Sequence, residues 1–242
     1  MNGIELAVRF SYITNHLHYC GPYDAHDHFL AYLKSKTHEE LVQDKIKKFE
    51  GLFPYLSTIA EKHGRPLFDY EVIEAYWLGN HLLDAFTDED LAGIIKKLMQ
   101  RGLPSSIGNE LITSMPKGLM PHHNYHVLYV GPGRTTGTVP TTIQTMDNCR
   151  VSYGEVINVE GERLLVSTDT LYEENSQFFL RKDTKTAVFL KDMLPTIKKG
   201  DVVALHWGFA PLILTPEQLR NLQSYTKKII DILNSSSLPD IT

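Results

Sequence analysis

Two residues of types that bind transition metals, a cysteine and a histidine, stand in glycine-containing segments of the second half of the chain. Cys149 opens a β-rich segment, 149–161, and His206 is flanked by apolar residues in the segment 200–210. Thiolate and imidazole are both ligands of transition metals. Residue chemistry alone favours a buried thiol and a hydrogen-bonded core histidine, because free cysteine is among the most buried residue types. The pair is nevertheless the leading candidate for a metal site.

A second set of reactive side chains lies in the first half. Cys20 stands in a Tyr-Cys-Gly-Pro turn just before a predicted helix, whose N-terminus can favour a thiolate. His122 and His126 are four positions apart, so they share a face of either a helix or a strand. Asn80 follows an aromatic-rich helix end. Together these four residues predict, as an alternative, an enzyme active site in which a histidine serves as the base.

Each member of this second set also has a structural explanation. The cysteine can be a small apolar plug at a turn, the histidines can make structural hydrogen bonds, and aromatic residues at helical spacing are usually core. The histidine segment lacks the glutamate of a His-Glu-x-x-His metalloprotease motif, so zinc hydrolysis is not supported.

Composition narrows the classes of function. The 242 residues carry a formal net charge of −5, so the chain has no basic footprint of the kind that nucleic-acid binders use, and we expect no nucleic acid as partner. The start lacks the pattern of a signal peptide, and no apolar run is long enough to cross a bilayer. We therefore expect a cytoplasmic protein without a membrane partner. Two cysteines are too few for a disulfide framework.

The first half reads as helices. Apolar stripes, capping residues and terminal glycines predict five of them, at 24–33, 37–51, 54–62, 70–78 and 87–102. The stretch 105–118 is polar and broken by glycine and proline, and 135–145 is rich in threonine and glycine without an amphipathic period. We predict a mostly α-helical domain over residues 1–134 and a linker over 135–147.

The last part of the chain reads as short strands followed by one helix. Strands are predicted at 155–159 and 163–167, joined by a tight Glu-Gly-Glu turn, and then at 177–180, 187–190 and 202–206. Several short strands within some sixty residues suggest a small barrel. Thr215 and the Pro-Glu-Gln after it form a helix start, and an apolar stripe continues to Leu233. The predicted fold class is α+β, with an OB-like barrel and a closing helix over residues 148–242.

Residues 148 to about 234 resemble the hydrogenase maturation chaperones of the HypC/HupF family. The segment from Cys149 to the Glu-Gly at 160–161 follows the family's opening cysteine, glycine-containing turn and strand. Residues 200–210 read Gly-Asp-Val-Val-Ala-Leu-His-Trp-Gly-Phe-Ala and fit the family's Gly-Asp-x-Val-x-x-His-x-Gly-Phe-Ala segment. The whole chain also looks like an uncharacterised prokaryotic family with Tyr-Cys-Gly-Pro and Pro-His-His-x-x-His motifs, which implies no activity.

The resemblance to the chaperones implies an accessory protein of nickel-iron hydrogenase maturation. Cys149 and His206 would hold iron, and the partners would be other maturation proteins or the hydrogenase large subunit. In the enzyme alternative, the barrel is a docking module for the helical domain. A third interpretation is an interaction scaffold that has kept the barrel and lost the metal.

Overall fold

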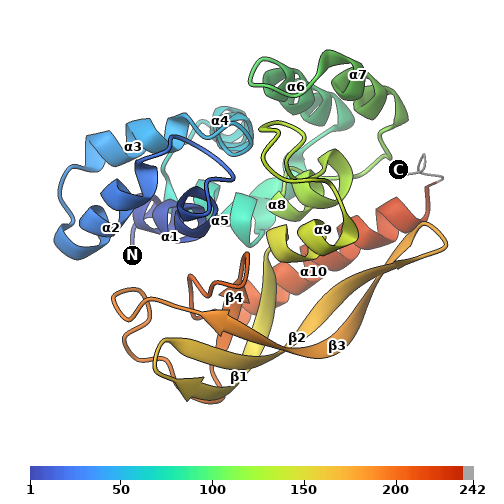
Figure 1. Cartoon of the computed structure of the whole chain (residues 1–242). Coiled ribbons are helices and arrows are strands. Elements are labelled where there is room, and N and C mark those ends of the chain that lie inside the picture. Colours follow the sequence, from blue (N-terminus) through green and yellow to red (C-terminus); the bar gives the residue numbers. More distant parts are fainter. Residues whose placement is uncertain (237–242) are drawn as a thin grey trace.

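A helical layer lies against a single antiparallel sheet, so the fold is α+β (Figure 1). The structure is a computed structural model, and it describes residues 1–236. The last helix, α10, runs along the sheet and touches both β3 and the short helix α8. The helices are α1 Gly3–His16, α2 Ala25–Ser35, α3 Glu39–Lys47, α4 Phe53–His63, α5 Tyr70–Trp77, α6 Asp88–Met99, α7 Ser105–Ser114, α8 His123–Tyr125, α9 Ile143–Cys149 and α10 Pro216–Asn234, with the short helical turns η1 His81–Ala85 and η2 His126–Val130.

Local signals placed several helices correctly. The side chain of Asp69 caps α5, and Thr87 forms a capping box with Asp90 at the start of α6. Helix α1 was not predicted, because it is buried on nearly every side and therefore shows no amphipathic stripe. The polar stretch after residue 104 forms α7, and α9 occupies the end of the segment that the sequence favours as a linker.

The four strands form an open sheet in the order β3-β2-β1-β4. Their bounds are β1 Ser152–Glu160, β2 Arg163–Glu174, β3 Gln177–Val188 and β4 Val202–Leu205. The predicted hairpin between β1 and β2 is confirmed, with Gly161 in the left-handed conformation at φ 62°. The two strands predicted at 177–180 and 187–190 are one continuous strand, β3, which pairs with β2 along its whole length.

The predicted OB-like barrel is not confirmed, because the sheet does not close. Among the described residues, no strand runs along the outer edge of β3: Val188 pairs with the turn around Phe209 at one end, and Phe178 forms hydrogen bonds with the side chain of Asn234 at the other. A long two-stranded arm of β2 and β3 extends away from the Val188 contact (Figure 1). Closure would require a strand along the whole of that edge.

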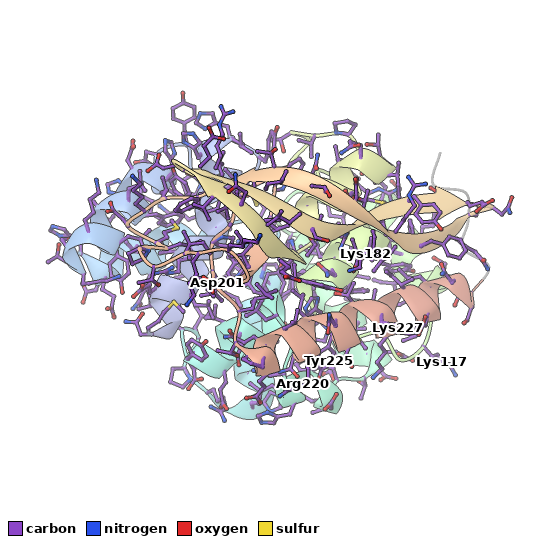
Figure 2. All side chains as sticks on the ribbon, turned by 90° about the horizontal axis from the view of Figure 1, so that it is seen from below. Lys117, Lys182, Asp201, Arg220, Tyr225 and Lys227 are labelled. Atoms are coloured by element: carbon purple, nitrogen blue, oxygen red, sulfur yellow. The ribbon has the colours of Figure 1, made fainter. Side chains whose placement is uncertain are left out.

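Helix α10 begins as the sequence predicts. Thr215 and Gln218 form a capping box, and Pro216 occupies the first turn. The buried stripe includes Leu222 and Leu233. Seen from below, Arg220, Tyr225 and Lys227 lie along α10, and Lys182 lies on the strand beside it (Figure 2).

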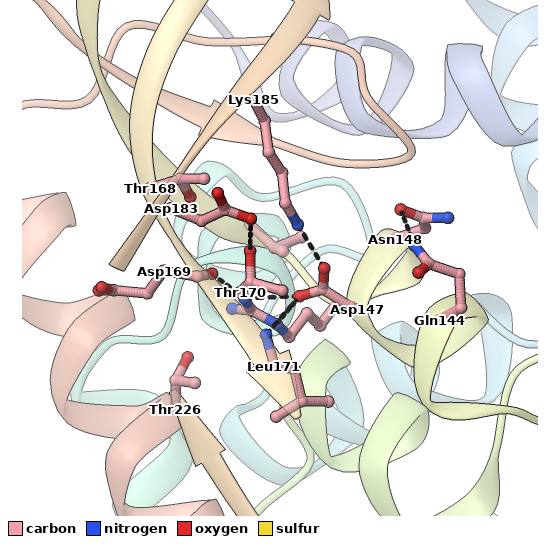
Figure 3. Close-up of polar contacts among 12 residues, drawn as sticks. Gln144, Asp147, Asn148, Thr168, Asp169, Thr170, Leu171, Asp183, Lys185 and Thr226 are labelled. Atoms are coloured by element: carbon pink, nitrogen blue, oxygen red, sulfur yellow. Dashed lines mark hydrogen bonds and ion pairs between the residues drawn. The ribbon is translucent and has the colours of Figure 1, made fainter. Parts of the chain in front are cut away.

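A buried carboxylate fixes α9 to the sheet. Asp147 pairs with Arg150 at 2.9 Å, accepts a hydrogen bond from the backbone N–H of Leu171 at 2.8 Å, and pairs with Lys185 of β3 (Figure 3). Arg150 also donates to the backbone oxygen of Asp169. These contacts determine where the C-terminal end of α9 lies, and with it the position of Cys149. None of the helices formed by residues 1–236 is long and apolar enough to cross a membrane.

Candidate metal centre

Cys149 and His206 meet His123 in a cavity of about 70 Å³ between the helical layer and the sheet. Cys149 ends α9, His206 follows β4 directly and His123 opens α8. One ligand atom from each of the three side chains lies within 4.8 Å of the other two. All three residues are buried, at 8%, 1% and 5% exposure respectively. The group can hold a metal ion.

The imidazole of His206 is held in one tautomer. Its Nδ1 lies 3.1 Å from the backbone oxygen of Phe10, which can only accept, so Nδ1 carries the proton. Nε2 is then an acceptor, and it is buried without a hydrogen-bond partner. Metal-binding histidines usually donate their second ring N–H to a carbonyl or carboxylate in this way. Burial lowers the pKa of His206 to about 4, so the ring is neutral at pH 7.

His123 is the most constrained of the three. Its Nε2 donates to the backbone oxygen of Cys149 at 2.9 Å, so its Nδ1 accepts from the hydroxyl of Tyr76 at 2.9 Å. Burial, with a smaller effect from the neighbouring His206, lowers the pKa of His123 well below its usual value. The ring is therefore neutral, and it can act as a ligand only by exchanging one of these two hydrogen bonds.

The Cys149 thiol is protonated in the absence of a cation. Burial raises the pKa of Cys149 to about 12, and the nearby indole N–H of Trp207 acts in the opposite direction. A thiol of this kind is a poor nucleophile. Metal ions bind the thiolate, so binding at Cys149 would release a proton.

Two residues of the predicted enzyme site line the same cavity, namely Cys20 and His126. The Cys20 thiol lies 3.7 Å from a carboxylate oxygen of Glu50, and burial followed by the charge of Glu50 raises the pKa of Cys20 to about 12. His126 shares a hydrogen bond of 3.0 Å with the hydroxyl of Tyr55 through Nδ1. Burial lowers the pKa of His126 to about 4. No hydrogen bond joins Cys20 to a histidine among residues 1–236, so a thiol–imidazole pair is not formed.

The other two residues of that predicted site lie outside the cavity. Asn80 caps η1 by accepting from the backbone N–H of Leu82 at 3.1 Å, and it donates to the backbone oxygen of Glu71. His122 caps α8 through Nδ1, which accepts from the backbone N–H of Asn124 at 2.9 Å. Burial lowers the pKa of His122 to about 3. The structure therefore divides the predicted four-residue site.

His123 carries no separate signal in the sequence, although it stands within the histidine cluster 122–126. The four-residue spacing instead favours His122 and His126 as a pair, because residues four apart share one face of a regular helix. His122 instead precedes α8 with extended backbone angles, φ −89° and ψ 152°. Helical periodicity does not apply to a cap residue, so His123 and His126 face the cavity together.

The comparison with known proteins identifies a family but no activity. A family model, DUF6390, described as a family of unknown function, matches residues 1–239. No curated protein and no solved structure matches the chain. The matched range includes both the helical layer and the sheet, so the cavity between them lies wholly within it.

Proposed function

The chain belongs to this family of unknown function, DUF6390, and we propose that it is a metal-binding accessory protein of nickel-iron hydrogenase maturation. Cys149, His206 and His123 would hold the ion, and iron is the metal that we propose. The maturation role rests on the resemblance of residues 148–234 to the HypC/HupF chaperones. The metal site rests on geometry.

One observation carries the metal site. The Nε2 atom of His206 is a buried acceptor without a hydrogen-bond partner, and it belongs to a group whose ligand atoms lie within 4.8 Å of one another. A buried polar atom without a partner costs about 1–3 kcal/mol. A cation coordinated by Nε2 would remove this cost, and Phe10 already orients the ring for it.

The donor set suits iron in its chemistry. A thiolate and two neutral imidazoles are ligands for iron as well as zinc. Cys149 would supply the one negative charge, with the Trp207 indole N–H beside the sulfur favouring the thiolate. The part of the cavity not occupied by these three ligands would leave room for a group that the protein delivers or receives.

The test is the metal content of protein purified without oxygen and loaded with Fe²⁺ or Zn²⁺ in parallel. We expect about one ion per chain in the wild type and a loss of at least tenfold in affinity for Cys149→Ala and His206→Ala. Cys20→Ala is the matched control, since Cys20 lines the same cavity but lies outside the group of three. Equal metal content in all four proteins would show that these residues do not form a metal site.

The maturation role has its own test. In a host that makes a nickel-iron hydrogenase, deletion of the gene should lower hydrogenase activity, and wild type but not Cys149→Ala should restore it. Unchanged activity after deletion would exclude the maturation role while leaving the metal site intact. Partner capture that persists in Cys149→Ala would instead favour a scaffold without metal.

The enzyme alternative keeps one supporting observation, the presence of Cys20 and His126 in the same cavity. In that proposal the sheet serves as a docking module. It requires a thiolate at neutral pH, and the raised pKa of Cys20 opposes this. We expect iodoacetamide at pH 7 to leave Cys20 of the folded protein unmodified. Rapid alkylation of Cys20, abolished by substitution of His126, would favour the enzyme.

A further inference from the structure

The cavity holds most of the buried polar atoms that lack a hydrogen-bond partner. Six such side-chain atoms occur among residues 1–236, and five belong to residues that line the cavity. These five atoms are Ser11 Oγ, Trp77 Nε1, Thr135 Oγ1, His206 Nε2 and Trp207 Nε1. Native proteins satisfy almost all buried polar groups, so a site where several protein atoms remain unpaired is a candidate for binding water, an ion or a ligand.

The chemistry of these atoms indicates that the group bound in the cavity accepts hydrogen bonds. Both indole nitrogens can only donate, and the two hydroxyls can donate as well. Only His206 Nε2 is a fixed acceptor, and the proposed metal ion would occupy it. The lining residues include no lysine, arginine, aspartate or glutamate. The group that completes the cavity therefore offers acceptor atoms to several neutral donors.

Charge and size limit this group further. A divalent ion held by one thiolate and two neutral imidazoles has one positive charge left, and an uncompensated buried charge is costly. A single additional negative charge would neutralise the centre. One water molecule needs about 10–15 Å³ of cavity volume. A cavity of about 70 Å³ therefore admits a group of only a few heavy atoms.

We propose that the metal centre keeps one coordination position open toward this cavity and binds a small monoanion there. Ser11 and Thr135 donate hydrogen bonds to the anion, and Trp77 adds an indole N–H, because the Trp207 N–H stands beside the Cys149 sulfur. The inference rests on the metal site proposed above and specifies the class of its external ligand. Halide-sized and azide-sized anions have the required charge and dimensions.

Cys20 could occupy the open coordination position in place of an anion, because its thiolate would also neutralise the remaining positive charge of the metal centre. Its thiol instead lies 3.7 Å from Glu50, and the same carboxylate oxygen accepts the backbone N–H of Gly21 at 2.9 Å. A Cys20 thiolate would stand beside this carboxylate and be repelled by it. The geometry thus favours an anion from solution.

The experiment uses the full-length protein loaded with Co²⁺ and titrated with sodium azide. A thiolate-to-cobalt absorption band, absent in Cys149→Ala, reports metal binding. Azide should then shift the cobalt d–d bands saturably. Ser11→Ala and Thr135→Val should keep the thiolate band and weaken azide binding about tenfold each, the usual effect of losing a hydrogen bond to a charged group. Cys20→Ser is the matched control and should bind azide like the wild type.

The outcomes separate the two proposals. A wild type without a thiolate band would exclude the metal site itself. A normal band with d–d bands insensitive to azide would leave the metal site intact and overturn the open position. A Cys20→Ser protein with altered cobalt bands would make Cys20 the fourth ligand, and unchanged azide affinity in both hydroxyl variants would overturn the role of the donors. Near-UV circular dichroism of each variant establishes that it is folded.

Discussion

Burial keeps the four histidines in and beside the cavity neutral, and each forms hydrogen bonds with a different set of partners. His206 is oriented by a backbone oxygen, His123 by a tyrosine and a backbone oxygen, and His126 by a tyrosine. His122 uses the same chemistry for a purely structural purpose, the cap of α8. At the residue scale, therefore, an unpaired ring nitrogen that must be an acceptor distinguishes the proposed ligand His206 from His122 and His123, whereas burial and a lowered pKa do not.

The buried histidines make the folded state sensitive to acid. A histidine whose pKa is lowered by folding adds stability above its unfolded pKa of about 6.5, and this stability is lost as the pH falls toward the folded value. For His122, with a folded pKa of about 3, the loss between pH 7 and pH 5 is on the order of 2 kcal/mol.

His122→Asn tests this contribution, because the amide oxygen can accept the same N–H of Asn124 without titrating. We expect the free energy of unfolding in urea, measured on metal-free protein at pH 5 to 8, to depend less on pH in the variant than in the wild type. Equal slopes would show that His122 does not stay neutral in the folded protein.

At the scale of elements, the position of Cys149 depends on how α9 is attached. The Asp147 carboxylate joins α9 to β2 through the backbone of Leu171 and to β3 through Lys185, and Arg150 continues the network (Figure 3). Asp147 and Arg150 are almost fully buried. Breaking one partner of a buried ion pair is costly, since the other charge remains without compensation.

We therefore expect Asp147→Asn to lower the free energy of unfolding by about 3–5 kcal/mol. The double variant Asp147→Leu with Arg150→Met removes the two fully buried charges, while the partly exposed Lys185 can reach solvent, so it should be less destabilised than the single variant. Urea unfolding of the three proteins measures the difference. If the single and double variants lost the same stability, the isolated charge of Arg150 would not be the cause. The metal affinity of Asp147→Asn should also fall, because α9 carries Cys149.

At the scale of the whole molecule, buried polar contacts join the helical layer to the sheet. Asn124 of α8 donates to the backbone oxygen of Val151 at 2.9 Å, accepts from its N–H at 2.8 Å, and donates to Thr226 of α10. Arg9 of α1 donates to the backbone oxygens of Met193 and Pro211. Buried hydrophobic residues of both layers belong to one core cluster. The cavity depends on both layers.

This packing predicts one cooperative unfolding transition for the metal-free protein. Tryptophan fluorescence reports mainly on the cavity through Trp77 and Trp207, and far-UV circular dichroism reports on all helices, so the two urea curves should coincide. Two separated transitions would instead favour the division into domains at residues 135–147 that the sequence suggests.

The sequence by itself determined the features that depend on near neighbours in the chain. The start of α10 at Thr215, the capping box at Thr87 and the hairpin at Gly161 each need only a few consecutive residues. The order of helices followed by strands also follows from local patterns. Cys149 and His206 could be selected as a pair because each stands in a distinctive segment, although nothing local sets the distance between them.

Only the tertiary structure decided what surrounds that pair. Burial on nearly every side removed the helical signal from α1, and within the described part of the chain no strand pairs along the outer edge of β3, so the sheet stays open; both depend on how distant segments pack. His123 joined the pair and Asn80 was excluded from it for the same reason. Residue types and spacing limit which side chains can do chemistry, whereas long-range packing determines which of them meet and which polar atoms are left unpaired.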